Sequence, residues 1–122
     1  MKKSRSILKD KSFEFALSVI HLYRQIIKDR EFVMSKQLLR SGTSVGANIR
    51  EAQNAQSRLD FIHKLSISQK ECDESMYWLE LLNKSGYLKD EVFMEYHSKA
   101  ESLLKMLRSA ILSTKQRPRQ NP

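Results

Sequence analysis

The segment from Arg40 to Glu51 places two glycines and a run of small polar residues inside a pattern that is otherwise typical of an amphipathic helix. Each glycine should weaken a helix by about 1 kcal/mol relative to alanine. A helix that carries this cost usually needs close backbone approach or buried hydrogen bonding at that point. The segment therefore predicts a helix that packs tightly against a second helix around Gly42 and Gly46. No catalytic motif accompanies it.

Apolar and small residues recur at alternating steps of three and four in four stretches of the chain, which is the spacing of one helix face. These stretches predict helices over roughly 10–29, 35–56, 58–84 and 90–114. Gly and Pro number only three and two, and no stretch shows the alternation of a strand. Since short connections join four long helices, we predict an all-α fold, an up-down-up-down antiparallel four-helix bundle.

The ends of these helices carry capping signals. Ser35 and Ser57 are the expected N-caps of the second and third helices, and Asp60 follows Ser57 at the spacing of a capping box. Gly86 should end the third helix in the left-handed conformation, and Asp90 should cap the fourth.

The first helix carries two apolar stripes, rotated by about 100° from one another. The stripes consist of Phe13, Ala16, Ile20, Tyr23 and Ile27, and of Phe15, Val19, Leu22 and Ile26. One stripe suffices to pack a helix into a small bundle. A helix sunk deeply in its own core would explain the second stripe. We favour contact with another subunit, and therefore expect a homo-oligomer.

The second and third helices should form an antiparallel hairpin that places Val45 near Ser68 and Ser41 near Cys72. Both helices have small residues at the centre of their seams, so we expect them to approach closely, with Gly46 in the tight contact. A buried polar layer is expected from Ser41, Ser44, Asn48, Ser68 and Ser75. Such a layer fixes the register of the helices at some cost in stability. Cys72 should be a buried, unreactive thiol.

The formal net charge of +8 is concentrated at the two ends of the chain. Residues 1–11 carry five Lys/Arg and one Asp, and residues 105–122 carry five Lys/Arg and no acid. We divide the chain into a basic N-terminal segment (1–9), a bundle domain (10–114) and a flexible basic tail (115–122). Basic ends are typical of nucleic-acid binding, and solvated ends that aid solubility are the alternative.

If the basic ends bind RNA or DNA, their side chains should contact phosphates without reading sequence. The candidate residues are Lys2, Lys3, Arg5, Lys9, Lys11, Arg24, Lys28, Lys105, Arg108, Lys115, Arg117 and Arg119. The alternative is a protein-interaction or scaffold module whose charge is incidental. Tyr77 and Trp78 lie off the main seam of their helix, and we favour a role as interface anchors over packing at the edge of the core.

Other site classes find no support in the sequence. The three histidines lie on three different expected helices without the paired Glu-x-x-His motifs of a di-iron bundle, so we expect no metal, no cofactor and no catalytic residue. Apolar runs are far shorter than the roughly 20 residues of a membrane span. The basic N-terminus is not followed by an apolar signal core, so we expect a cytoplasmic protein without membrane contact.

Residues 37–52 read QLLRSGTSVGANIREA. This motif, the Phe61 start of the third helix and the turn at Gly86 resemble the bacterial four-helix bundle proteins encoded in intervening sequences of 23S ribosomal RNA genes. Relatives of that family include the accessory variability proteins of diversity-generating retroelements. The family pattern is approximately QLxRSAxSIPxNIAEG, and Gly42, Val45 and Gly46 here replace its Ala, Ile and Pro. The resemblance covers about residues 10–112.

The resemblance implies a protomer that assembles into a ring-like homopentamer with a central pore. It also implies a nucleic-acid or ribonucleoprotein role, since the retroelement relatives associate with RNA and with a reverse transcriptase, a possible protein partner here too. It offers no catalytic residue, and its motif residues are structural: Arg40, Ser41, Ser44, Gly46, Asn48 and Glu51. The resulting prediction is a non-enzymatic, oligomeric nucleic-acid-binding accessory protein.

Overall fold

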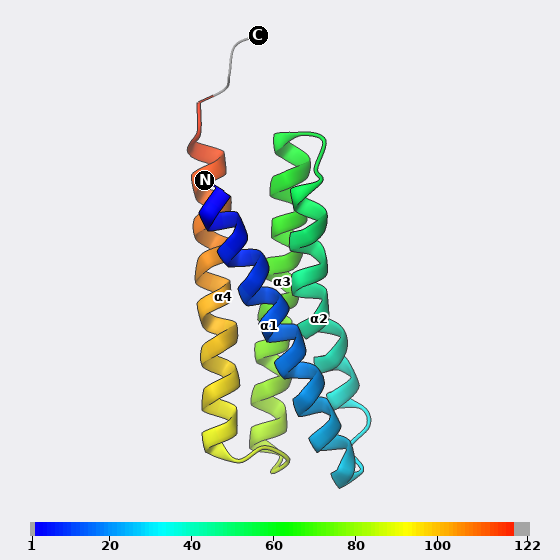
Figure 1. Cartoon of the computed structure of the whole chain (residues 1–122). Coiled ribbons are helices and arrows are strands. Elements are labelled where there is room, and N and C mark those ends of the chain that lie inside the picture. The colour runs from blue at the N-terminus through cyan, green and yellow to red at the C-terminus, as the bar shows by residue number, and fades with distance from the viewer. Residues whose placement is uncertain (1, 119–122) are drawn as a thin grey trace.

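A computed structural model of the chain describes residues 2–118. The helices are α1 (Lys2–Ile26), a short 3-10 turn η1 (Ile27–Asp29), α2 (Met34–Gln53), α3 (Arg58–Lys84) and α4 (Asp90–Gln116). In the view of Figure 1, α1 runs down, α2 up, α3 down and α4 up, and α1 crosses diagonally over the others. The described residues contain no strand, and the predicted all-α four-helix bundle is confirmed.

The first helix begins at Lys2, well before the expected start near residue 10. The reason is that Leu8 and Ser12 are both buried and extend the buried stripe of α1 by two further steps of the same spacing. At the other end of the chain, α4 continues to Gln116, two residues beyond the expected bundle boundary. Most of the segment expected to precede the bundle is therefore part of its first helix.

The core consists of one buried seam from each helix. In α3 the buried residues recur at the expected alternating steps of three and four, and they are Leu65, Ser68, Cys72, Ser75, Leu79 and Leu82. In α4 the buried face runs from Tyr96 to Ile111 and continues to Thr114. The hydroxyl of Tyr96 donates a hydrogen bond to the backbone oxygen of Ser18 at 3.2 Å, which ties α4 to α1.

Two of the predicted helix ends are confirmed. The Ser57 hydroxyl accepts a hydrogen bond from the backbone N–H of Asp60 at 3.0 Å and caps α3. Gly86 has a φ of 91° and follows the end of α3. The N–H of Gly86 bonds to the oxygen of Asn83, and the N–H of Tyr87 bonds to the oxygen of Leu82, which together form a Schellman motif.

The start of α2 differs from the expectation that Ser35 is its N-cap. The helix begins one residue earlier, and the carboxylate of Glu31 accepts hydrogen bonds from the backbone N–H groups of Val33, Met34 and Ser35 at 2.7–3.0 Å. Burial opposes ionisation of Glu31, but these hydrogen bonds outweigh it and lower its pKa. An anion at a helix N-terminus also interacts favourably with the helix dipole, so Glu31 replaces the predicted serine cap.

The expected cap of α4 is also wrong by one position. Lys89 occupies the N-cap position, and Asp90 is the first helical residue. The Asp90 carboxylate accepts a hydrogen bond from the side-chain amide of Asn83 at 2.9 Å. Asp90 therefore ties the turn after α3 to the start of α4, and its charge still lies at the favourable end of the helix dipole.

The glycines of α2 face a different helix from the one expected. A Cβ atom at Gly42 would lie 2.9 Å from both γ-carbons of Val19, and one at Gly46 would lie 3.4 Å from the backbone oxygen of Ser12. Both neighbours belong to α1. The placement of Gly46 in the contact between the second and third helices is therefore wrong, because the glycines permit the close crossing of α1 over α2.

The buried polar layer between α2 and α3 forms only in part. The hydroxyl of Ser75 donates to that of Ser41 at 2.9 Å, and the hydroxyl of Ser68 donates to the backbone oxygen of Val45 at 2.8 Å. Ser44 and Asn48 instead bond to backbone oxygens within α2. Val45 thus faces Ser68 as predicted, whereas the expected partner of Ser41, Cys72, bonds to α4 through Ala100 at 3.1 Å.

Candidate nucleic-acid interface

The bundle brings the two basic ends of the chain to one end of the molecule. The first turns of α1 lie beside the last turns of α4, since Ile7 and Leu8 share a pocket lining with Ser113 and Arg117 (Figure 1). Exposed cations from both helices therefore occupy the same half of the bundle. We call this group the basic pole; its described side chains are Lys9, Lys11, Lys105, Arg108, Lys115 and Arg117.

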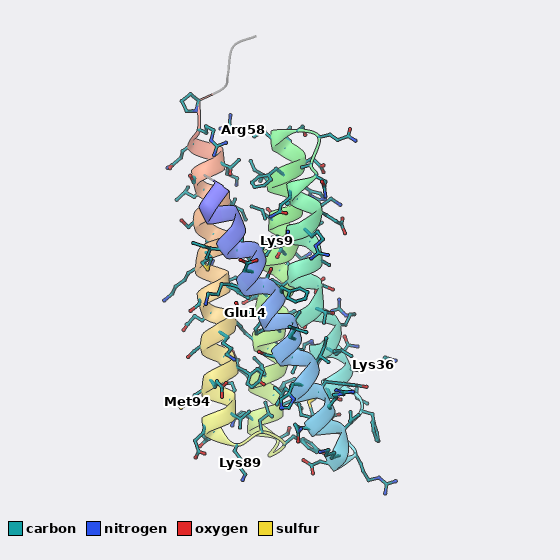
Figure 2. All side chains as sticks on the ribbon, viewed as in Figure 1. Lys9, Glu14, Lys36, Arg58, Lys89 and Met94 are labelled. Atoms are coloured by element: carbon teal, nitrogen blue, oxygen red, sulfur yellow. The ribbon has the colours of Figure 1, made fainter. Side chains whose placement is uncertain are left out.

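The charge of α4 changes sign along its length. Residues 90–104 carry four acids and one Lys, whereas residues 105–118 carry four Lys/Arg and no acid. The basic half ends at the pole, and the acidic half begins near Lys89 at the opposite end (Figure 2). Cations in the last turns of a helix also interact favourably with its dipole, so this pattern is compatible with a stable helix.

Arg58 adds a further cation to this end of the bundle, and sequence reasoning missed it (Figure 2). Its guanidinium donates to the backbone oxygen of Thr114 at 3.0 Å and also bonds to those of Lys115 and Arg117. These carbonyls lie at the C-terminus of α4, where a helix leaves its last carbonyls without partners one turn on, although that of Thr114 also accepts the N–H of Arg117. A signal was present, because a bundle of this topology places the start of α3 beside the end of α4.

Not every predicted phosphate contact belongs to the pole. Arg24 and Lys28 are exposed, but they lie at the opposite end of the bundle, in the last turn of α1 and in η1. The structure therefore does not bring them together with Lys105 or Arg117. The side chains of Lys2, Lys3 and Arg5, together with Arg119, lie outside the described residues.

Arg40 joins α2 to α3 instead of facing a ligand. Its guanidinium forms ion pairs with Glu71 at 3.2 Å and with Glu74. The indole N–H of Trp78 bonds to Glu74 at 3.1 Å, and this bond together with the Arg40 charge lowers the pKa of Glu74 despite its partial burial. The exposed ring of Tyr77 packs against the edge of Trp78, with ring centroids 5.0 Å apart. Trp78 thus belongs to this polar network at the edge of the core.

Of the other motif residues, Glu51 also connects two helices. Glu51 forms an ion pair with Lys64 at 2.8 Å across the α2–α3 hairpin, and the Glu51 carboxylate raises the pKa of that lysine. Cys72 is fully buried, and burial raises the pKa of its thiol to about 12. The thiol therefore stays protonated at neutral pH and is a poor nucleophile.

Two other site classes are absent from the part of the chain that the structure describes. No group of three His, Cys, Asp or Glu side chains in residues 2–118 is arranged to hold a metal ion. Among the same residues, no helix combines the length and the apolar character that crossing a membrane requires. The basic pole is the feature of the described surface with the clearest chemical character.

Comparison with known proteins places the chain in a family. It is similar to a protein of unknown function from the S23 ribosomal protein family of Bacteroides thetaiotaomicron, whose crystal structure matches with a TM-score of 0.88 and 49% sequence identity. The match covers 89% of this chain and 98% of that one. No curated protein matches the chain in sequence. The family model for the 23S rRNA-intervening sequence protein matches residues 5–109. The chain therefore belongs to the 23S rRNA-intervening sequence protein family.

Proposed function

We propose that this protein is a non-enzymatic accessory protein that binds nucleic acid through the basic pole, without reading sequence, and that it acts as a homo-oligomer. The observation that carries the proposal is the meeting of two basic segments, which are about 100 residues apart in sequence, at one end of the bundle. Lys and Arg side chains that neutralise phosphates release condensed counterions, which drives binding to any sequence.

The surface of α1 supports self-association. Of its two stripes, one is buried in the protomer, while Phe13 and Ile20 of the other are 53% and 38% exposed, and the neighbouring Leu17 is 53% exposed. These residues line a groove of about 480 Å³ between α1 and α2, together with Thr43 and Ala47. A second copy that covers this groove would remove the apolar face from water. Each added protomer would also bring another basic pole to the same ligand.

Salt dependence tests this function. We expect the full chain to bind a 20-nucleotide single-stranded RNA and a 20-base-pair RNA duplex, with affinities that fall steeply as the salt concentration rises. Replacing Lys105, Arg108, Lys115 and Arg117 together by Gln should weaken both complexes. The slope of log K against log salt should become shallower by up to about 3, because four phosphate contacts are lost.

A matched control removes the same number of charges from the other end of the bundle. Replacing the exposed Arg24, Lys28, Lys36 and Lys89 together by Gln should change the slope much less. Equal effects of the two variants would contradict a pole-centred interface and would indicate diffuse attraction by net charge. If the unaltered protein fails to bind either probe at low salt, the alternative function of a protein scaffold is favoured, with the exposed α1 face as its docking surface.

A further inference from the structure

A pocket of about 440 Å³ lies within the basic pole, between the start of α1, the start of α3 and the last turns of α4. This volume falls in the range of about 300–1,000 Å³ that is typical of small-molecule sites. Its apolar lining comes from Ile7, Leu8, Phe61, Leu65, Met106 and Ala110. Leu8 and Leu65 are buried and form part of the bundle core, so the bottom of the pocket is apolar and belongs to the packed core. We call it the slot.

One edge of the slot carries hydrogen-bond donors and positive charge. Lys105, Ser109, Ser113 and Arg117 all line it, and they follow one another at steps of four along α4. Residues at this spacing form a continuous ridge on one helix face. All four are exposed. The ridge thus presents two cations and two hydroxyl groups beside an apolar cavity.

The part of α4 that lines the slot carries only positive charges. From Ser102 to Pro118 the chain contains no acid, and Arg58 adds a positive charge where α4 ends. A ligand that complements the slot therefore needs an apolar part for the cavity and an anionic part for the ridge. An unpaired nucleotide has both, since its base has an apolar face and its phosphate is an anion.

We propose that the slot receives an unpaired base of a single-stranded nucleic acid, while the adjoining phosphates contact the ridge of Lys105, Ser109, Ser113 and Arg117. This inference rests on the proposed function and adds to it a choice of ligand. A duplex holds its bases in the stack and must extrude one before the slot can take it. A single strand has no such cost, so the protein binds single strands more tightly than duplexes.

The test compares the two RNA probes at one salt concentration by fluorescence anisotropy. Ala110 is partly buried in the slot wall, and Ala110→Leu should narrow the cavity without changing any charge. Affinity for the single strand should fall about tenfold, the size of effect expected for losing one base contact, while duplex affinity should change less than twofold. Ser98→Leu is the matched control, because Ser98 is exposed on the acidic half of α4, and it should change neither affinity.

A second measurement does not depend on any variant. A single-stranded probe that carries one 2-aminopurine should show lower accessibility of that base to acrylamide once the full-length protein binds. A base that stays fully accessible, or a wild-type protein with equal affinity for the two probes, would overturn the slot. So would a folded Ala110→Leu variant that keeps the wild-type ratio of affinities.

These outcomes separate the slot from the proposed function. If both probes bind in a salt-dependent way and Ala110→Leu changes neither affinity, the basic pole remains the interface and only the base contact is removed. Absence of all RNA binding removes both. Tight binding to phosphatidylserine vesicles that Ala110→Leu abolishes, without any preference for single strands, would assign the slot to an acyl chain and overturn the proposal.

Discussion

At Gly42 the side chain of any other residue would collide with Val19, since even a Cβ atom would lie within 3.2 Å of three atoms of that valine. Overpacking of this kind typically costs about 1–3 kcal/mol. We predict that Gly42→Leu lowers the free energy of unfolding by this amount, and that Gly46→Leu, whose nearest contacts are at 3.4 Å, costs less. Urea denaturation measures both. Lys36→Leu, at an exposed site of α2, is the control and should be nearly neutral.

The lowered pKa of the Glu31 carboxylate leads to a prediction of how the free energy of unfolding depends on pH. The pKa of Glu31 is below its ordinary value of 4.5 in the folded protein, because three backbone N–H groups bond to it. Its contribution is therefore fully present above the unfolded pKa and is lost as the pH falls through the lower, folded pKa. Glu31→Gln should destabilise the protein by about 1 kcal/mol at neutral pH, as loss of a helix cap does. It should also flatten the acid limb of the stability curve, and an unchanged limb would contradict the assignment.

At the scale of helices, the C-terminus of α4 depends on a residue of α3. Arg58 bonds to three backbone oxygens between Thr114 and Arg117, of which the Thr114 oxygen also accepts the N–H of Arg117. We predict that Arg58→Ala loosens the last turn of α4 by about 1.5–3 kcal/mol, the usual contribution of hydrogen bonds that involve a charged group. Hydrogen exchange of the amides of residues 113–117 should become faster. Arg50→Ala, which removes an exposed cation from α2, should leave those amides unchanged.

The same residue connects the fold to the proposed interface. Lys115 and Arg117 lie at the end of α4, where Arg58 bonds to the backbone, so loss of Arg58 should weaken RNA binding by more than its one charge accounts for. This would be seen as a larger loss of affinity for Arg58→Ala than for Arg50→Ala at the same salt concentration.

At the scale of the whole molecule, the exposed stripe of α1 predicts assembly. We expect light scattering at micromolar concentration to give a multiple of the 14.3 kDa protomer mass, with a pentamer as the form that the family resemblance implies. Leu17→Glu should dissociate the assembly while leaving the helical content intact, because Leu17 is already 53% exposed in the protomer. Tyr77→Glu, at a similarly exposed position on α3, should not. A wild-type monomer would rule out self-association.

The sequence alone was enough to predict the four helices, where α3 begins after Ser57 and how it ends at Gly86, although not that α1 begins as early as Lys2. These features depend on a spacing of about 3.6 residues and on caps that act within one turn, so they can be recognised from residues close together in the chain. The buried seam of α3 was predictable for the same reason. So was the concentration of charge at the two ends, although not which cations lie together.

Only the tertiary structure decided which neighbour each face meets. The spacing of Gly42 and Gly46 shows a close contact but does not say that α1 makes it. Likewise, no local pattern distinguishes Glu31 from Ser35 as the cap of α2, because the turn before the helix determines which oxygen reaches the free N–H groups. Arg58 finds its carbonyl partners 56 residues away, and such a pairing follows from how whole helices pack. The basic pole and its slot exist for the same reason, since the topology of the bundle places the two ends of the chain side by side.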